Sequence, residues 1–210
     1  MMFFWMIVTR CADTLVLLPI AAVCLAWFLC GRAWRMALWW CALFGLGLML
    51  VVASKVAFIG WGIGIQALDF TGFSGHAMRA TAVLPVVFYL AAERATPQIR
   101  CTALLLGLML GGMVGYSRLV LLVHSVSEVL AGCVLGGVVA LGFIWQAHPL
   151  SQPVRYRGLI VLVLASLVLT PVLLTEPAPT EHWLQKISLA LSGHPQPFTR
   201  AMWHSTSPAP

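Results

Sequence analysis

The sequence predicts an all-α integral membrane protein, built as a bundle of about six transmembrane helices. Of its 210 residues, 61% are hydrophobic and only 9% are charged, whereas a soluble domain carries about 25% charged residues. A bilayer core about 30 Å thick takes about 20 apolar residues per helix, so six spans use about 120 residues. We therefore expect one membrane domain over residues 1–174, followed by a partly mobile tail, rich in Pro and Ser, over 175–210.

Six apolar stretches supply the expected spans. They cover residues 15–30, 36–53, 74–92, 101–116, 119–145 and 158–174. Residues 56–72 are also apolar, but they are rich in glycine, and their apolar part before Asp69 is short for a span. We expect this segment to be re-entrant or interfacial.

Arginine placement predicts the orientation in the membrane. Half of the twelve basic residues fall in alternate connectors, namely Arg32, Arg35, Arg94, Arg100, Arg155 and Arg157. The positive-inside rule places these connectors in the cytoplasm and the opposite helix ends on the outer side of the cell (inner) membrane. The net charge of +6 includes no basic run, so membrane orientation explains it better than nucleic-acid binding does.

Small residues recur at helical spacing. Gly107, Gly111 and Gly115 are four residues apart, as are Gly132 and Gly136. Such rows let helices approach closely, either within one chain or across a dimer face, so the sequence leaves the oligomeric state open. The six cysteines have no metal-ligand spacing, which indicates small buried side chains.

The first polar stretch is Phe73-Ser74-Gly75-His76, at the start of an apolar segment. A helix N-terminus offers free N–H groups and partial positive charge to a phosphate, and glycine allows close approach. Ser74 can cap the helix or donate to a phosphate oxygen. The competing interpretation is a capped helix with an incidental histidine.

The second polar stretch is Ser117-Arg118, followed by His124 and Glu128. His124 and Glu128 are four residues apart and share a helix face. A carboxylate there can hold one imidazole nitrogen and leave the other as a nucleophile. If Ser117-Arg118 lies in a loop above them, Arg118 can bind a phosphate with its planar guanidinium. The alternative is a structural Glu–His pair beside a snorkelling arginine.

Together the two stretches resemble the pattern of the type 2 phosphatidic acid phosphatase (PAP2) superfamily, which is Ser-Gly-His followed by Ser-Arg-x5-His-x3-acid. The resemblance covers residues from about 50 to 145. It implies a membrane lipid phosphatase in which His124 is the nucleophile, Glu128 orients it, and His76 is the acid and base. It also implies that Lys55, Ser74, Gly75 and Arg118 bind phosphate, and that neither a metal nor another cofactor is needed.

Three positions depart from that pattern. Gly62-Ile63 stands where the family has Arg-Pro after the lysine, Phe73 replaces a proline, and Glu128 replaces an aspartate. The first change removes one phosphate clamp. Arg79, one turn below His76, either replaces the lost cation or snorkels toward the interface.

The expected activity is hydrolysis of a lipid phosphate at the outer face, with the lipid tail between helices. Candidate substrates are a polyprenyl diphosphate, phosphatidic acid and phosphatidylglycerophosphate. A lipid-to-lipid phosphotransferase would use the same phosphohistidine. Two other possibilities are a catalytically inactive membrane scaffold and a haem-binding electron carrier with His76 and His124 as axial ligands.

Overall fold

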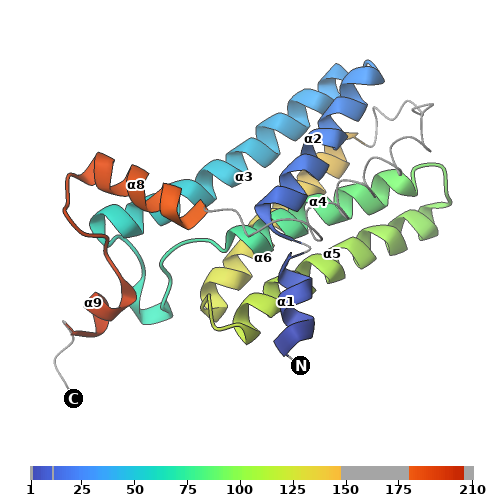
Figure 1. The fold of residues 1–210 in the computed structure, drawn as a ribbon. Coiled ribbons are helices and arrows are strands. Elements are labelled where there is room, and N and C mark those ends of the chain that lie inside the picture. Colours follow the sequence, from blue (N-terminus) through green and yellow to red (C-terminus); the bar gives the residue numbers. More distant parts are fainter. Residues whose placement is uncertain (1, 11, 148–179, 206–210) are drawn as a thin grey trace.

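A computed structural model describes residues 2–10, 12–147 and 180–205 (Figure 1). Within these ranges the chain forms helices and no strand. The elements are α1 (Met2–Arg10), α2 (Thr14–Cys30), α3 (Trp34–Trp61), a 3₁₀ turn η1 (Gln66–Leu68), α4 (Gly75–Ala91), α5 (Pro97–Val120), α6 (Val126–Ala147), α8 (Thr180–Ser192) and α9 (Arg200–Ser205). The expected span over 158–174 lies outside the described residues.

The described part holds four helical stretches that are long and apolar enough to cross a membrane: α1 with α2, then α3, α5 and α6. The apolar helix α4 is shorter, at 17 residues. This composition supports a membrane protein. Five of the six expected spans fall on the described residues, and four helical stretches there are long enough to cross a membrane.

Helix α4 lies at the centre of the bundle and packs against α2, α3, α5 and α6. Met78, Val83 and Val86 on this helix have no exposed surface. Beside it, the Trp40 ring meets the Phe143 ring edge-on at 5.2 Å, and the Trp40 indole donates to the Ala21 carbonyl at 3.0 Å. Because it is enclosed on several sides, α4 gives the residues at its N-terminus a fixed position.

The glycine rows pack helices within the chain. A Cβ at Gly107 would lie 2.5 Å from Pro85 of α4, and one at Gly111 would lie 2.8 Å from Thr81. On the other side, a Cβ at Gly136 of α6 would lie 2.3 Å from the Met78 carbonyl oxygen. The intramolecular use of these glycines is thus observed, with α5 and α6 both drawn close to α4.

Helix α3 is longer than the sequence suggested. Residues 56–61 continue the helix past Lys55, so the expectation of a separate re-entrant or interfacial segment over 56–72 is wrong at its start. The helix ends where Gly62 adopts φ 69° and the N–H groups of Gly62 and Ile63 donate back to Phe58 and Ala57. A left-handed cap favours glycine, and this cap, rather than the lysine, sets the boundary.

The expected span over 119–145 is wrong at its start, because the chain turns at residues 121–125. The N–H groups of Leu122 and Val123 donate to the carbonyls of Leu119 and Arg118, which closes α5, with Leu122 at φ 55°. A non-glycine residue in this conformation costs about 1 kcal/mol and gives no strong sequence signal. As a consequence, Ser117 and Arg118 lie in the last turn of α5 and not in a loop.

The described C-terminal residues, 180–205, form two helices, and α8 packs along the second half of α3 (Figure 1). A Cβ at Gly60 would lie 3.3 Å from the Ser188 carbonyl oxygen. Farther on, the Phe198 N–H donates to the Ile59 carbonyl at 2.9 Å, and the Trp203 ring meets Phe58 edge-on at 4.8 Å. These contacts bring residues 180–203 next to the end of α3.

Candidate active site

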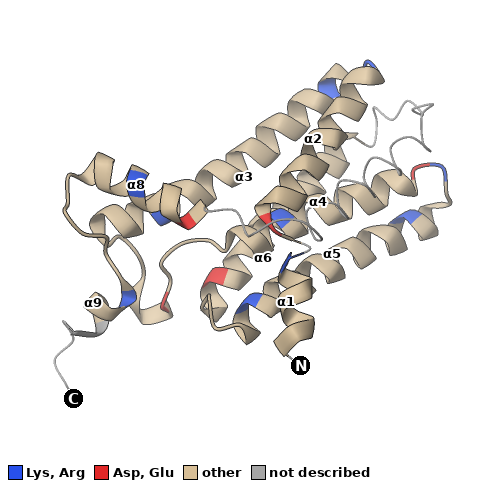
Figure 2. Cartoon of the chain, viewed as in Figure 1, with Lys and Arg blue, Asp and Glu red and all other residues tan. Residues whose placement is uncertain are grey.

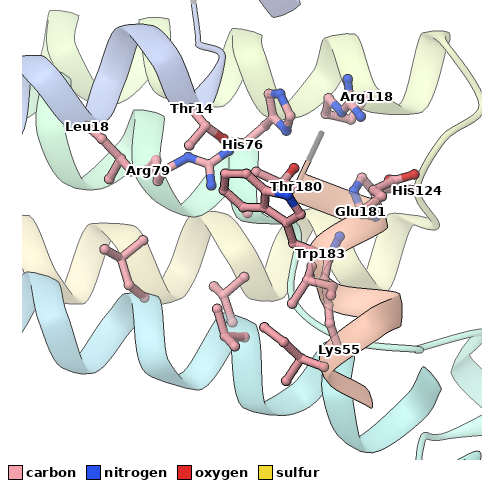
Figure 3. A pocket seen from close by; sticks show the side chains of 16 residues that line it. Thr14, Leu18, Lys55, His76, Arg79, Arg118, His124, Thr180, Glu181 and Trp183 are labelled. Atoms are coloured by element: carbon pink, nitrogen blue, oxygen red, sulfur yellow. The ribbon is translucent and has the colours of Figure 1, made fainter. Parts of the chain in front are cut away.

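A cavity of about 320 Å³ opens between α2, α3, α4 and α8 (Figure 3). Its charged and titratable lining comes from four helices and one turn: Lys55, His76, Arg79, Arg118, His124 and Glu181. The sequence predicted that His76, Arg118, His124 and Lys55 come together, and in the structure they line one cavity. Gly75 lines it as well.

His124 and Glu128 form a close pair at the start of α6. The His124 Nδ1 and Glu128 Oε2 atoms are 2.6 Å apart, and Glu128 is only 1% exposed. With the proton on Nδ1, the histidine donates to the carboxylate and Nε2 keeps its lone pair. Glu128 does not line the large cavity, so it can act there only through His124.

The use of glutamate at position 128 has a local structural reason. Ser125 precedes α6, and its hydroxyl accepts from the Glu128 N–H at 3.4 Å, while Glu128 Oε2 accepts from the Ser125 N–H at 3.3 Å. This reciprocal pair is a capping box, which takes Glu or Gln three residues after the cap. The same carboxylate oxygen therefore starts the helix and holds His124.

The other carboxylate oxygen of Glu128 is also occupied. Oε1 accepts from the Thr71 N–H at 2.9 Å and from the Thr71 hydroxyl. Arg200 Nη2 lies 2.6 Å from the same oxygen, and its Nε lies 3.4 Å from Asp69. Residues from the 62–74 loop and from α9 thus fix the carboxylate, and the sequence did not point to either Thr71 or Arg200.

His76 lies in the first turn of α4 and is 19% exposed. Its Nε2 is 3.9 Å from an oxygen of Asp13, which caps α2 by accepting from the Leu15 N–H at 3.0 Å. Asp13 is one of only six acidic residues in the chain. Acidic residues in so apolar a sequence are functional candidates in themselves, and that signal could have identified Asp13 and Glu181.

The cations are held by neighbouring elements. Arg118 Nη1 donates to the Thr9 hydroxyl of α1 at 3.0 Å. Lys55 lies beside the loop at Gly72, which has a φ of 149°, and a Cβ at Gly72 would lie 3.2 Å from Lys55. Glu181 of α8 puts negative charge close to both Lys55 and Arg118.

Ser74, like Glu128, is a predicted site residue that does not line the cavity. It is fully buried, its side chain makes no capping hydrogen bond, and its hydroxyl has no partner within the described residues. A Cβ at Gly132 would lie 3.3 Å from the Ser74 Cβ, so the side chain faces α6. Its backbone N–H donates to the Glu128 carbonyl at 3.1 Å, which ties the start of α4 to the start of α6.

The remaining wall of the cavity is apolar. Side chains of α2, α3 and α8 form it: Leu18, Leu48, Val51, Val52, Trp183, Leu184 and Ile187. A second cavity of about 190 Å³ shares Lys55, His124 and Glu181 with the first. His124 thus lies where the two cavities meet.

Burial lowers the pKa of His124 below its ordinary value of 6.5, and the nearby charges of Lys55 and Arg118 act in the same direction. The hydrogen bond with Glu128 opposes this shift without cancelling it. A neutral His124 at neutral pH is the form that has a free lone pair on one ring nitrogen.

Comparison with known proteins agrees with the motif-based resemblance. The sequence profile of the PAP2 superfamily matches residues 63–152, which include His76, Arg118, His124 and Glu128 but not Lys55. An uncharacterized 22.5 kDa protein in the cps region of Klebsiella pneumoniae is 38% identical over 205 residues, covering 95% of this chain and 97% of that protein. No solved structure matches. The chain therefore belongs to the PAP2 superfamily, whose members are generally phosphatases.

Proposed function

We propose that this protein is a membrane phosphatase that hydrolyses a lipid phosphate or diphosphate through a phosphohistidine at His124. One observation carries the proposal, the 2.6 Å pair between His124 Nδ1 and Glu128 at the edge of a cationic cavity. A carboxylate on one ring nitrogen leaves the other as a nucleophile that is correctly oriented and neutral. The superfamily membership supports phosphatase chemistry.

In the proposed reaction, His124 Nε2 attacks the terminal phosphorus while the bond from that phosphorus to its leaving oxygen breaks; the leaving oxygen is the lipid oxygen of a monophosphate or the bridging oxygen of a diphosphate. His76 donates its proton to that leaving oxygen. His76 then takes a proton from water, the water oxygen attacks the phosphorus, and the phosphorus–nitrogen bond breaks. Inorganic phosphate leaves, and both histidines return to their starting states.

Fixed positive charge stabilises the transferring phosphoryl group in this proposal. Lys55 and Arg118 line the cavity, and the N-terminus of α4 at Gly75 adds N–H groups and partial positive charge. Preorganised donors of this kind can replace a metal ion in stabilising phosphoryl charge. The apolar wall suits the lipid part of a polyprenyl diphosphate, phosphatidic acid or phosphatidylglycerophosphate.

The proposed location is the inner membrane, with the site facing outward. Supporting this, the arginines of two tight connections lie at one end of the bundle, whereas the cavity lies at the other (Figure 2). These arginines are Arg32 before α3 and Arg35 in its first turn, and Arg94 before α5 and Arg100 in its first turn. The positive-inside rule then assigns that end to the cytoplasm.

Phosphate release by the purified protein from a panel of lipid phosphates and diphosphates tests the proposal. We expect release of inorganic phosphate that persists in excess EDTA and is abolished in His124→Ala. His182→Ala, which changes an exposed histidine of α8, is the matched control and should retain activity. Absence of release from every substrate would favour an inactive scaffold, and transfer of the phosphoryl group to a second lipid would favour the phosphotransferase.

A further inference from the structure

Arg79 is a buried cation on the wall of the cavity. Only 8% of the residue is exposed, and its Nε atom has no hydrogen-bond partner among the described residues. A guanidinium removed from water and left unpaired is strongly unfavourable, so such groups are normally paired or hold a ligand. Asp13 contributes negative charge nearby, but its oxygens serve the α2 cap and lie 3.9 Å from His76.

The guanidinium of Arg79 lies at the phosphate-facing end of α4. It lines the same cavity as His76 and Arg118, and Figure 3 shows it beside His76 on the cavity wall. A Cβ at Gly75 would lie 3.3 Å from Arg79 Nη1, so the side chain folds back along its own helix toward the N-terminus. It therefore points into the cavity and not along the helix toward the cytoplasmic end.

Position 62, where the family pattern has its arginine, cannot serve that role here. Gly62 has φ 69°, a backbone conformation that a side chain rarely adopts. A Cβ there would also meet the Phe198 ring at 3.0 Å. The C-terminal segment thus occupies the space into which a side chain at 62 would project.

We propose that Arg79 binds the substrate phosphate and supplies the cation that Gly62 cannot. Its guanidinium lines the cavity together with Arg118, Lys55 and Gly75, where phosphate oxygens would lie. A planar guanidinium can donate two hydrogen bonds to one phosphate. The inference rests on the proposed function, because it assigns a further phosphate ligand to the same cavity.

Binding of orthovanadate to the purified full-length protein tests Arg79 without a lipid substrate. Titration calorimetry on the wild type, Arg79→Gln and Arg79→Lys would give the dissociation constants. We expect Arg79→Gln to weaken binding about 10- to 100-fold, the scale of one or two charge-assisted hydrogen bonds. Arg79→Lys keeps the charge but not the bidentate guanidinium, so its affinity should lie between those of the wild type and Arg79→Gln. Arg94→Gln, an exposed residue in the connection between α4 and α5, is the matched control.

The outcomes separate the two proposals. Unchanged vanadate affinity in the Arg79 variants, with binding lost in Arg118→Gln, would overturn the role of Arg79 and leave the proposed function standing. Failure of the wild type to bind vanadate would overturn both. If Arg79→Gln does not fold, the vanadate affinity of Arg79→Lys decides between the two roles. A phosphate-binding Arg79 predicts weaker binding in this variant, whereas an arginine that only snorkels predicts wild-type affinity.

Discussion

Arg200 of α9 and Glu128 of α6 form an ion pair of 2.6 Å, on the opposite carboxylate oxygen from the one that holds His124. The C-terminal segment thus reaches the group that positions the candidate nucleophile. Glu128 is almost fully buried, whereas Arg200 is 33% exposed. The pair links the packing of α9 to the geometry of His124.

Replacing Arg200 with glutamine should lower the rate of phosphate release about tenfold, because Glu128 Oε1 would keep only Thr71 as a donor. The effect should appear mainly in kcat, since Arg200 does not line the large cavity. Lys186→Gln on the exposed face of α8 is the control for loss of a tail charge. Equal kcat in Arg200→Gln and wild type would mean that the ion pair does not position the carboxylate.

Substitution of Glu128 tests both of its oxygens. Glu128→Gln should lower the rate steeply, because an amide cannot stabilise a developing imidazolium; the equivalent change in serine proteases costs about 10⁴ in rate. Glu128→Asp shortens the arm by about 1 Å and should cost about 10²-fold, the scale of a small misplacement. Circular dichroism should show both variants folded. A fully active glutamine variant would make Glu128 a purely structural residue.

The pH dependence should follow the lowered pKa of His124. The neutral imidazole is the nucleophile, so activity is lost as pH falls through the folded-state pKa and the ring becomes protonated. Because that pKa lies below 6.5, the acid limb of kcat/KM should have its midpoint below pH 6.5. Steady-state assays between pH 4 and 8 measure it. A midpoint above 6.5 would mean that the hydrogen bond with Glu128 outweighs burial.

Cysteine labelling tests the proposed orientation. In a background with the six native cysteines replaced, a membrane-impermeant maleimide added outside intact cells should label Leu68→Cys and Leu122→Cys. Leu68 and Leu122 are 59% and 89% exposed, at the cavity end of the bundle. Ala95→Cys, at the opposite end, should react only after the cells are opened. The reverse pattern would place the site in the cytoplasm.

The sequence predicted the chemistry of the site better than its framework. Lys55, His76, Arg118 and His124 meet in one cavity because motif spacing places them at the ends of neighbouring helices. The helix boundaries differed from the prediction. The turn between α5 and α6 uses a left-handed residue at Leu122, and the sequence has no glycine there to indicate it. The contact between Arg200 and Glu128 could not have been predicted from the sequence. It depends on tertiary packing, in which α8 lies on α3 and Phe198 lies beside Gly62.

The most direct test of the account is to trap the phosphoryl group on the protein. Purified protein mixed with a ³²P-labelled lipid phosphate and quenched within milliseconds should carry label that is stable in alkali and lost in acid, as expected for a phosphohistidine. Peptide mapping should place the label at His124, and His124→Ala should carry none. Label that persists in His124→Ala, or turnover without any labelled protein at any quench time, would contradict His124 as the nucleophile.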